Sequence, residues 1–389
     1  MSNSDVDLAS LSLFLATPEQ ATESRRRTHK VWGNGMTEEE YISRDEECAQ
    51  SLCGCDGKFK TWVLAPRDNP QTLDFKCSCE TFQRTGVVHR LNTSTEVSSY
   101  GIASVFTPPQ HRRKGYACHM MHLLHWILAP KSYLDPATFP EQWGAPPPSC
   151  SLYGGDAQFS ALYSDVGDFY LSCGPKPNED GWVIRGANSV VWDVDQIPEP
   201  SASETLPAGD WKWLIESDLH DLMLRDSLLL QSENNSTAPV SFTFLPFAGV
   251  EAFQRERQKI FWEKEIPPIE KWGIIHGSVN NVCPTTCFAT WTFELKPSMP
   301  RTLVITRLRV DEGNEAQVRD LFRFVFQVAK THKVMKIEVW DVPSSIKDTL
   351  TRMGGQAVKR DEHLPAFKWY GPEKHETIVW LHNEKFGWC

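Results

Sequence analysis

The chain opens with two helical patterns and then changes to strand periodicity. A helix is expected over residues 17–32, where Thr17 can cap the first turn and Pro18 suits the first helical position. A second helix is expected to begin at Thr37 and run through Cys48, because Glu40 completes a Thr-x-x-Glu capping box. Further along, the pattern predicts strands at 59–64, 74–82 and 97–107, and an apolar helix at 116–128.

The later pattern continues this mixture of strands and helices. Residues 149–153 are expected to form a strand, and residues 156–166 a helix that ends at Gly167. The same reasoning predicts strands at 169–172, 182–191, 288–295, 303–310 and 336–342, and helices at 211–230, 314–330 and 344–352. Elements over 288–355 follow in the same order as those over 75–167, which favours a degenerate internal duplication.

Length and composition indicate two globular domains. One core rarely grows beyond about 250–300 residues, whereas this chain has 389 residues, 40% of them hydrophobic. The stretch 197–210, which contains several Pro and Ser residues, is the predicted linker. The domains are therefore expected at 1–196 and 211–389.

The net charge and the lack of a membrane-span or signal-peptide pattern limit the expected classes of partner and compartment. The net charge of −10 disfavours nucleic acid and anionic membranes. No apolar run reaches the roughly 18–20 residues of a membrane span, and no basic segment precedes the short apolar stretch near the N-terminus. The 11 scattered cysteines are expected to stay reduced, which favours a cytoplasmic protein. A monomer and a homodimer both stay open.

The most informative segment joins the strand at 97–107 to the apolar helix. It reads Gln-His-Arg-Arg-Lys-Gly-Tyr-Ala over residues 110–117, with three consecutive cations before Gly115. The N–H groups and dipole of a helix N-terminus favour an anion there, and Gly115 lets a phosphate approach the main chain. The glycine patterns of Rossmann and P-loop sites are absent from it.

This segment resembles the first motif of the GNAT acetyltransferase superfamily. Arg112-x-x-Gly115-x-Ala117 matches its Gln/Arg-x-x-Gly-x-Gly/Ala signature, and Tyr163 stands four residues before Gly167, as a tyrosine does in the second motif. The resemblance implies an α/β GNAT fold in 1–196, with a mixed, splayed sheet and helices on both faces. A C-terminal α+β domain, expected to be a degenerate GNAT-like unit, would help to form the acceptor cleft.

The resemblance also implies a set of site residues for acetyl-CoA, with no metal. Main-chain groups at Val105 and Thr107 would pair with the pantetheine arm. Tyr163 would protonate the departing thiolate. The pyrophosphate would lie on the turn formed by Arg112, Arg113, Lys114, Gly115, Tyr116 and Ala117. The signature does not recur after residue 200, so one donor site per chain is expected.

A closer resemblance is to the fungal L-lysine ε-N-acetyltransferases. It rests on residues 105–117, residues 162–170 and the aromatic end at 382–389. It implies that the amine of a small molecule, the ε-amine of free L-lysine, attacks the thioester directly. Two alternatives stay open: another acceptor, such as a polyamine, an antibiotic or a peptide, and a non-catalytic acyl-CoA-binding protein.

The sequence does not select the groups that handle the acceptor. A carboxylate clamp for free lysine could come from Arg185, Arg307 or Arg309. The amide at the bend of 105–107 is a candidate oxyanion donor. Candidates for the general base are Glu96, Asp156, Asp165, His111 and the carboxylate of Cys389.

Other clusters are expected to be structural. Cys53-x-Cys55 and Cys77-x-Cys79 could converge on zinc if they lay on strands, because residues i and i+2 share a face, but free thiols are the favoured interpretation. Cys118 and Cys150 are formal candidates for a nucleophile, although burial explains them better. His119, His122 and His125 are expected to form a packing or solvated face of their helix.

Overall fold

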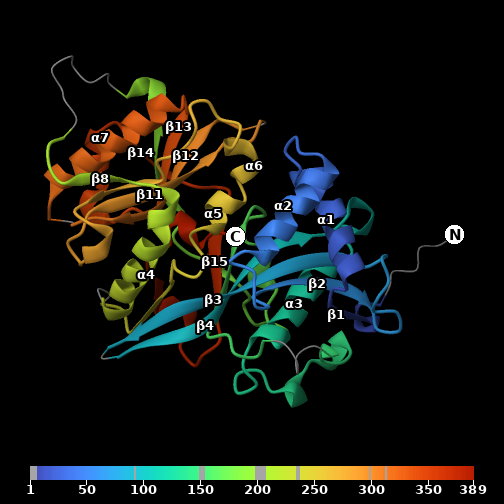
Figure 1. Ribbon diagram of the computed structural model, residues 1–389. Coiled ribbons are helices and arrows are strands. Elements are labelled where there is room, and N and C mark those ends of the chain that lie inside the picture. Colours follow the sequence, from blue (N-terminus) through green and yellow to red (C-terminus); the bar gives the residue numbers. More distant parts are fainter. Residues whose placement is uncertain are drawn as a thin grey trace.

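The computed structural model contains two twisted mixed sheets that lie side by side (Figure 1). It describes residues 7–91, 93–148, 154–197, 207–233, 237–297, 299–311 and 313–389. The first sheet has the order β1 (Leu11–Leu15), β2 (Phe59–Pro66), β3 (Cys77–Arg90), β4 (Thr93–Phe106), β5 (Phe159–Ser164), β15 (Leu364–Trp369) and β6 (Val183–Ile184), while β9 (Val240–Phe244) pairs with β3 and β16 (Ile378–Trp380) with β9. The second has the order β14 (Gln356–Lys359), β7 (Asn188–Asp193), β13 (Lys336–Trp340), β12 (Thr302–Arg309), β11 (Phe288–Glu294), β10 (Gly273–His276) and β8 (Trp211–Leu214).

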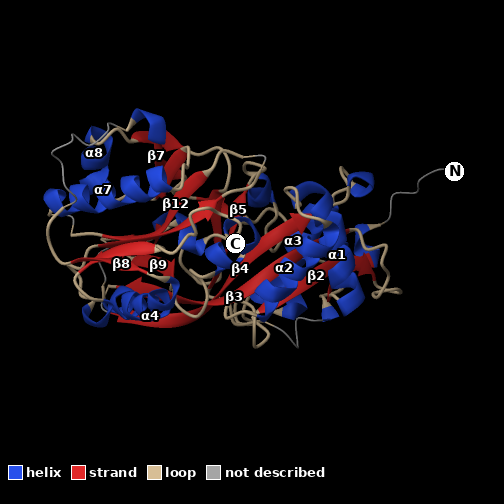
Figure 2. Ribbon diagram, turned by 45° about the horizontal axis from the view of Figure 1, so that its top comes forward, coloured by secondary structure: helices blue, strands red, loops and turns tan. Residues whose placement is uncertain are grey.

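Helices cover both sheets. Helices α1 (Pro18–Trp32) and α2 (Glu38–Gln50) lie across one face of the first sheet, and α3 (Tyr116–Leu128) packs into the core on the other face (Figure 1). Helices α7 (Glu315–Thr331) and α8 (Ser344–Arg352) lie on one side of the second sheet and α4 (Glu216–Ser232) on the other (Figure 2). The short helices α5 (Phe253–Glu256) and α6 (Lys259–Trp262) complete the set. No helix in the described ranges is long and apolar enough to cross a membrane.

The predicted helix starts are confirmed in atomic detail. The Thr17 hydroxyl accepts from the Gln20 amide, and the Gln20 side chain accepts from the Thr17 amide. Thr37 and Glu40 make the same reciprocal pair at the start of α2. These capping boxes satisfy amides that a helix N-terminus leaves unpaired, which fixes where both helices begin.

The helix predicted over 156–166 is wrong, because this segment forms strand β5. Phe159 and Ala161 pack into one core and Leu162 into another, so both faces of the strand are apolar and periodicity cannot distinguish it from a buried helix. The predicted strand at 169–172 is a 3₁₀ helix, Phe169–Ser172. The predicted helix at 211–230 divides into β8 and α4. Residues 149–153 lie outside the described residues.

The second sheet shares part of the topology of the first, although the helix at 156–166 on which the predicted repeat partly rested does not form. Strand β4 runs parallel to β5 up to the pair Ile102–Leu162, and β12 runs parallel to β13 up to Ile305–Val339. Strands β4 and β12 each contain an extra residue relative to their antiparallel neighbours β3 and β11. In β4 it follows Ala103, and in β12 it is Thr306. A helix follows each, α3 or α7. The C-terminal half is therefore a GNAT-like unit in topology.

The two sheets exchange strands, so the sequence boundary near 197–210 is not a boundary in space. Strand β7 belongs to the second sheet, whereas β9, β15 and β16 belong to the first, where β15 lies between β5 and β6. Residues 198–206 of the predicted linker lie outside the described residues. Residue 389 reaches the centre of the molecule, between the halves, as Figures 1 and 2 both show.

A buried ion network joins the last segment of the chain to the second sheet. Asp226 on α4 accepts from Arg307 Nε and Arg309 Nε, both at 2.7 Å, and is fully buried. Arg307 also donates to Glu384, whose other oxygen accepts from the Leu308 amide at 2.6 Å. Burial alone would raise the pKa of Asp226, but the two guanidinium groups bring it below its usual value.

We expect Asp226→Ala to lower the free energy of unfolding by about 3–5 kcal/mol, because two buried guanidinium groups lose their carboxylate. Denaturant unfolding measures the change. Since folding lowers the pKa of Asp226, its contribution exists above its unfolded pKa of about 3.9 and disappears as pH falls through the folded value. Asp221→Ala, at an exposed position of α4, is the matched control and should change stability by less than about 0.5 kcal/mol.

Candidate active site

Strands β4 and β5 separate where the predicted donor site begins. Their parallel pairing ends at Ile102–Leu162, although β4 continues to Phe106 and β5 to Ser164. Ser104 sits in the bulge of β4 with φ of +52°, and the ladder to β3 passes over Ser104 and Val105. The main chain at this bulge therefore pairs with neither neighbouring strand, which leaves it available to a ligand.

The turn after β4 forms an open helix N-terminus. Arg113 and Gly115 both have left-handed backbone, with φ of +63° and +77°, and Gly115 is the N-cap of α3. No described side chain caps this end of the helix. Arg112 Nε donates to the Thr107 carbonyl at 3.0 Å, which closes the turn. The first turn of α3 contains no acid, so it suits an anion.

A cleft of about 240 Å³ lies at this separation of the strands. Its floor is the main chain of β4 and β5. Its other walls come from segments far apart in sequence, from α1 and α2 to the end of the chain. The lining residues are Trp32, Asn34, Arg44, Ile102, Ala103, Ser104, Val105, Leu162, Tyr163, Asp165, Val166, Tyr170, Arg257, Gln258, Lys296, His363, Trp388 and Cys389.

Two tyrosines reach the cleft, and only one of them was predicted. Tyr163 is on strand β5, where its hydroxyl lies 3.4 Å from Asn383 Oδ1, and burial raises its pKa. Tyr170 is on the 3₁₀ helix after β5 and packs on the α3 side of the sheet, the side of the open helix N-terminus. Tyr170 also stands four residues before a glycine, Gly174, so the motif spacing fits it equally well.

Of the candidates for the general base, some line the cleft and others lie away from it. Asp165 and Cys389 both line the cleft. Asp165 pairs with His363 Nδ1 at 2.9 Å, and Cys389 packs against Gly101. Glu96 instead contacts Gln231, and Asp156 accepts from the Tyr100 hydroxyl at 2.7 Å. His111 lies 3.4 Å from Asp74. These last three do not line the cleft.

Sequence reasoning missed a buried carboxylate, Glu80 of β3. It is opposite Ala103 in the ladder, with an exposed fraction of 8%. Burial raises its pKa, Asp45 adds to the rise, and Ser104 and Arg257 oppose it. The one signal in the sequence is a lone acid within a buried strand. Only the register of β3 against β4 brings it to the bulge.

The cations of the cleft also differ from those expected. Arg307 and Arg309 belong to the buried ion network, and the Arg185 guanidinium donates to its neighbour's carbonyl outside the cleft. The cleft is lined instead by Arg44, Arg257 and Lys296. Arg44 is paired with Asp45 at 2.6 Å, whereas Arg257 and Lys296 form no ion pair with a described residue.

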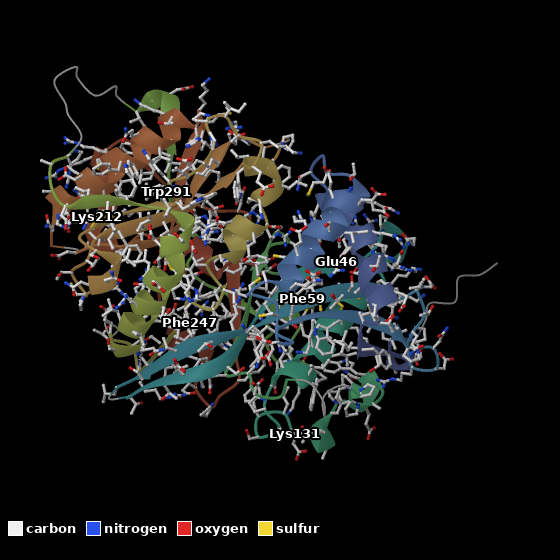
Figure 3. All side chains as sticks on the ribbon, viewed as in Figure 1. Glu46, Phe59, Lys131, Lys212, Phe247 and Trp291 are labelled. Atoms are coloured by element: carbon white, nitrogen blue, oxygen red, sulfur yellow. The ribbon has the colours of Figure 1, made fainter. Side chains whose placement is uncertain are left out.

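The four cysteines do not converge on one site, so the alternative zinc arrangement does not form. Cys77 and Cys79 share one face of β3 and are buried under α3, whereas Cys53 is buried on the opposite face, beside Phe82, and Cys55 lies partly exposed in the turn. The histidines of α3 are mainly packing residues. His125 is fully buried and hydrogen-bonded to Tyr370 and the Cys173 carbonyl, both at 2.8 Å. Side chains fill both halves of the molecule, with Phe59 in the first and Trp291 in the second (Figure 3).

The fold is similar to that of solved structures described as probable or GCN5-related acyltransferases. A probable N-acyltransferase from Enterococcus faecalis matches with a TM-score of 0.52 and 10% identity, over 92% of this chain and 72% of that one. A GCN5-related N-acetyltransferase from Kribbella flavida matches with a TM-score of 0.50 and 11% identity, over 92% and 72% of the two chains. Both likenesses concern the fold alone.

Sequence comparison gives the family. A lysine acetyltransferase from Yarrowia lipolytica is 27% identical over 182 residues, which cover 46% of this chain and 42% of that protein, less than half of its length. An uncharacterized protein of Saccharomyces cerevisiae is 21% identical over 94% of this chain and 95% of its own. The family described as the LYC1 GNAT-like C-terminal domain matches residues 195–389. The chain thus belongs to the LYC1 GNAT-like family.

Proposed function

We propose that the protein is an acetyltransferase that uses acetyl-CoA to acetylate the side-chain amine of a free amino acid, with the ε-amine of L-lysine as the leading acceptor. The observation that carries the proposal is the cationic wall of the cleft, formed by Arg44, Arg257 and Lys296. A free amino acid brings a carboxylate to these cations, whereas a polyamine brings only more positive charge. The relative named lysine acetyltransferase supports the choice of lysine.

The donor is proposed to enter by the turn before α3. The amides of residues 113–117 would hold its pyrophosphate at the open helix N-terminus, and the main chain at Val105 and Thr107 would pair with the pantetheine arm. Bound acetyl-CoA supplies the thioester that the amine attacks. This arrangement directs the reactive end of the donor through the gap between β4 and β5 into the cleft.

Residues around the bulge are proposed to carry the proton transfers. Glu80 does not line the cleft itself but lies opposite Ala103, which does. It would take the proton of the incoming ammonium directly or through one water, because its raised pKa moves it closer to that of a base that works near neutral pH. The Val105 amide would donate to the oxyanion. As the nitrogen–carbon bond forms and the carbon–sulfur bond breaks, Tyr170 would give its proton to the thiolate. Tyr163 is the second candidate for this acid.

Gly115→Val is expected to raise the dissociation constant for acetyl-CoA at least about 10-fold, because a β-branched residue is strained at φ of +77° and would distort the turn. Isothermal titration calorimetry measures this constant. Gly155→Val is the matched control, since Gly155 has φ of +78° and lies outside the donor turn. Equal affinity in the two variants would contradict the assignment of the turn.

Tyr170→Phe is expected to lower kcat by about 10²-fold with little change in acetyl-CoA affinity, because the thiolate loses its acid. Tyr163→Phe removes the other hydroxyl of the cleft and is expected to change kcat less. A thiol-release assay with lysine measures both. The reverse order of the two effects would assign the acid to Tyr163, and full activity in both would exclude a tyrosine acid.

Arg257→Gln is expected to raise KM for lysine about 10-fold or more without changing acetyl-CoA affinity, because the acceptor carboxylate loses a charged donor. The sharper measurement compares lysine with 1,5-diaminopentane, which is lysine without its carboxylate. The native protein should prefer lysine, and the variant should lose most of that preference. Arg323→Gln, on the exposed face of α7, is the control. An unchanged preference would place the carboxylate elsewhere.

A further inference from the structure

Two thiols meet beside the donor turn, although 55 residues separate them in sequence. Cys118 lies in the first turn of α3, and Cys173 directly follows the 3₁₀ helix that carries Tyr170. The Cys173 thiol donates to Cys118 Sγ at 3.2 Å. A disulfide bond measures about 2.05 Å, so a shift of about 1 Å would join the two sulfurs. They share no bond in the structure, and both are free cysteines.

The surroundings of Cys118 favour a thiolate. His122, one helical turn further on, has Nε2 at 3.3 Å from Cys118 Sγ. Its other nitrogen, Nδ1, donates to the Gly174 carbonyl at 2.6 Å, and its ring stacks on Trp143 with centroids 4.4 Å apart. The imidazole is therefore held in place beside the sulfur. The hydrogen bond from the Cys173 thiol and the neighbouring imidazole lower the pKa of Cys118 to about 5, although burial opposes the change.

The two cysteines are unequal, as a reactive thiol and its resolving partner are. Cys118 is partly exposed, so a small oxidant can reach it, whereas Cys173 has an exposed fraction of 0%. Cys173 donates its hydrogen bond to Cys118 and stays a thiol, because that bond and burial raise its pKa. Reactivity and access both favour Cys118 as the site of first attack.

We propose that Cys118 and Cys173 form a peroxide-sensitive oxidation site that closes reversibly into a disulfide. The Cys118 thiolate attacks one oxygen of a hydroperoxide, and the oxygen–oxygen bond breaks. The sulfur becomes a sulfenic acid, and the departing oxygen takes up one proton from solvent and leaves as water or alcohol. The Cys173 sulfur then attacks the Cys118 sulfur and expels the hydroxyl group as water, which takes up the Cys173 proton. In sum, two thiols are oxidised and one hydroperoxide is reduced. The disulfide would tie the start of α3 to the segment that carries Tyr170.

Cys283 and the pair Cys48–Cys53 serve as internal comparisons, because each has only one of the two features that Cys118 and Cys173 combine. Cys283 is exposed and Thr285 and Thr286 lower its pKa, but no other described cysteine lies in hydrogen-bond contact with it. Cys48 and Cys53 are close together, but both are buried. If exposure alone governed oxidation, Cys283 would react first. If proximity alone governed it, the Cys48–Cys53 pair would react as readily as Cys118–Cys173.

The experiment treats the reduced full-length chain with one to two equivalents of hydrogen peroxide and then maps thiols by differential alkylation and mass spectrometry. The proposal expects a mass loss of about 2 Da, a peptide pair linked through Cys118 and Cys173, and reversal by dithiothreitol. In Cys173→Ser, a sulfenic acid should persist at Cys118 and be trapped by dimedone. His122→Gln should slow the reaction about 10-fold, and Cys283→Ser should leave it unchanged.

Oxidation that starts at Cys283 or at the Cys48–Cys53 pair would overturn the proposal. So would a native chain in which Cys118 and Cys173 stay free while other thiols react. None of these readouts depends on acetyl-transfer, so failure here leaves the proposed function intact. Failure of the acetyl-CoA tests above would, in the same way, leave the oxidation site standing.

Discussion

The separation of β4 from β5 is the constraint on which the rest of the site depends. One extra residue at Ser104 breaks the ladder to β3 just after the last pair with β5, Ile102–Leu162. Backbone N–H and C=O groups seldom remain unpaired in a protein interior, so a gap of this kind calls for a ligand that pairs with the main chain. The open N-terminus of α3 lies at one end of the gap and the cleft at the other.

The second sheet has the corresponding strand order, but its bulge is covered and its helix N-terminus is capped. Its bulge, at Thr306, is followed by Arg307, whose guanidinium is buried against Asp226 and Glu384. Its helix, α7, is capped by the Asn314 side chain and begins with Glu315, which disfavours an anion. The two units therefore differ in electrostatics rather than in topology: the helix N-terminus of the first suits the proposed donor, and that of the second does not.

The C-terminal segment, residues 384–389, links the ion network of the second sheet to the cleft beside the first. Glu384 joins the ion network of the second sheet, and three residues later the Gly387 carbonyl accepts from Arg84 of the first sheet at 2.7 Å. Burial raises the pKa of Glu384 to about 7, although Arg307 opposes the rise. Trp388 and Cys389 then reach the cleft. The ion network therefore helps to position one wall of the cleft.

The sequence by itself determined the local features. Thr17, Thr37 and Gly115 mark helix starts through contacts within a few residues, and the turn proposed for the donor could be singled out because its residues are contiguous. The tertiary structure alone decided that β5 is a strand, since a segment buried on both faces has no distinctive period. It also decided which residues meet: Glu80 reaches the bulge by strand register, and Arg257 and Lys296 reach the cleft from the other half of the molecule. Such contacts depend on long-range pairing, which no local pattern of side chains specifies.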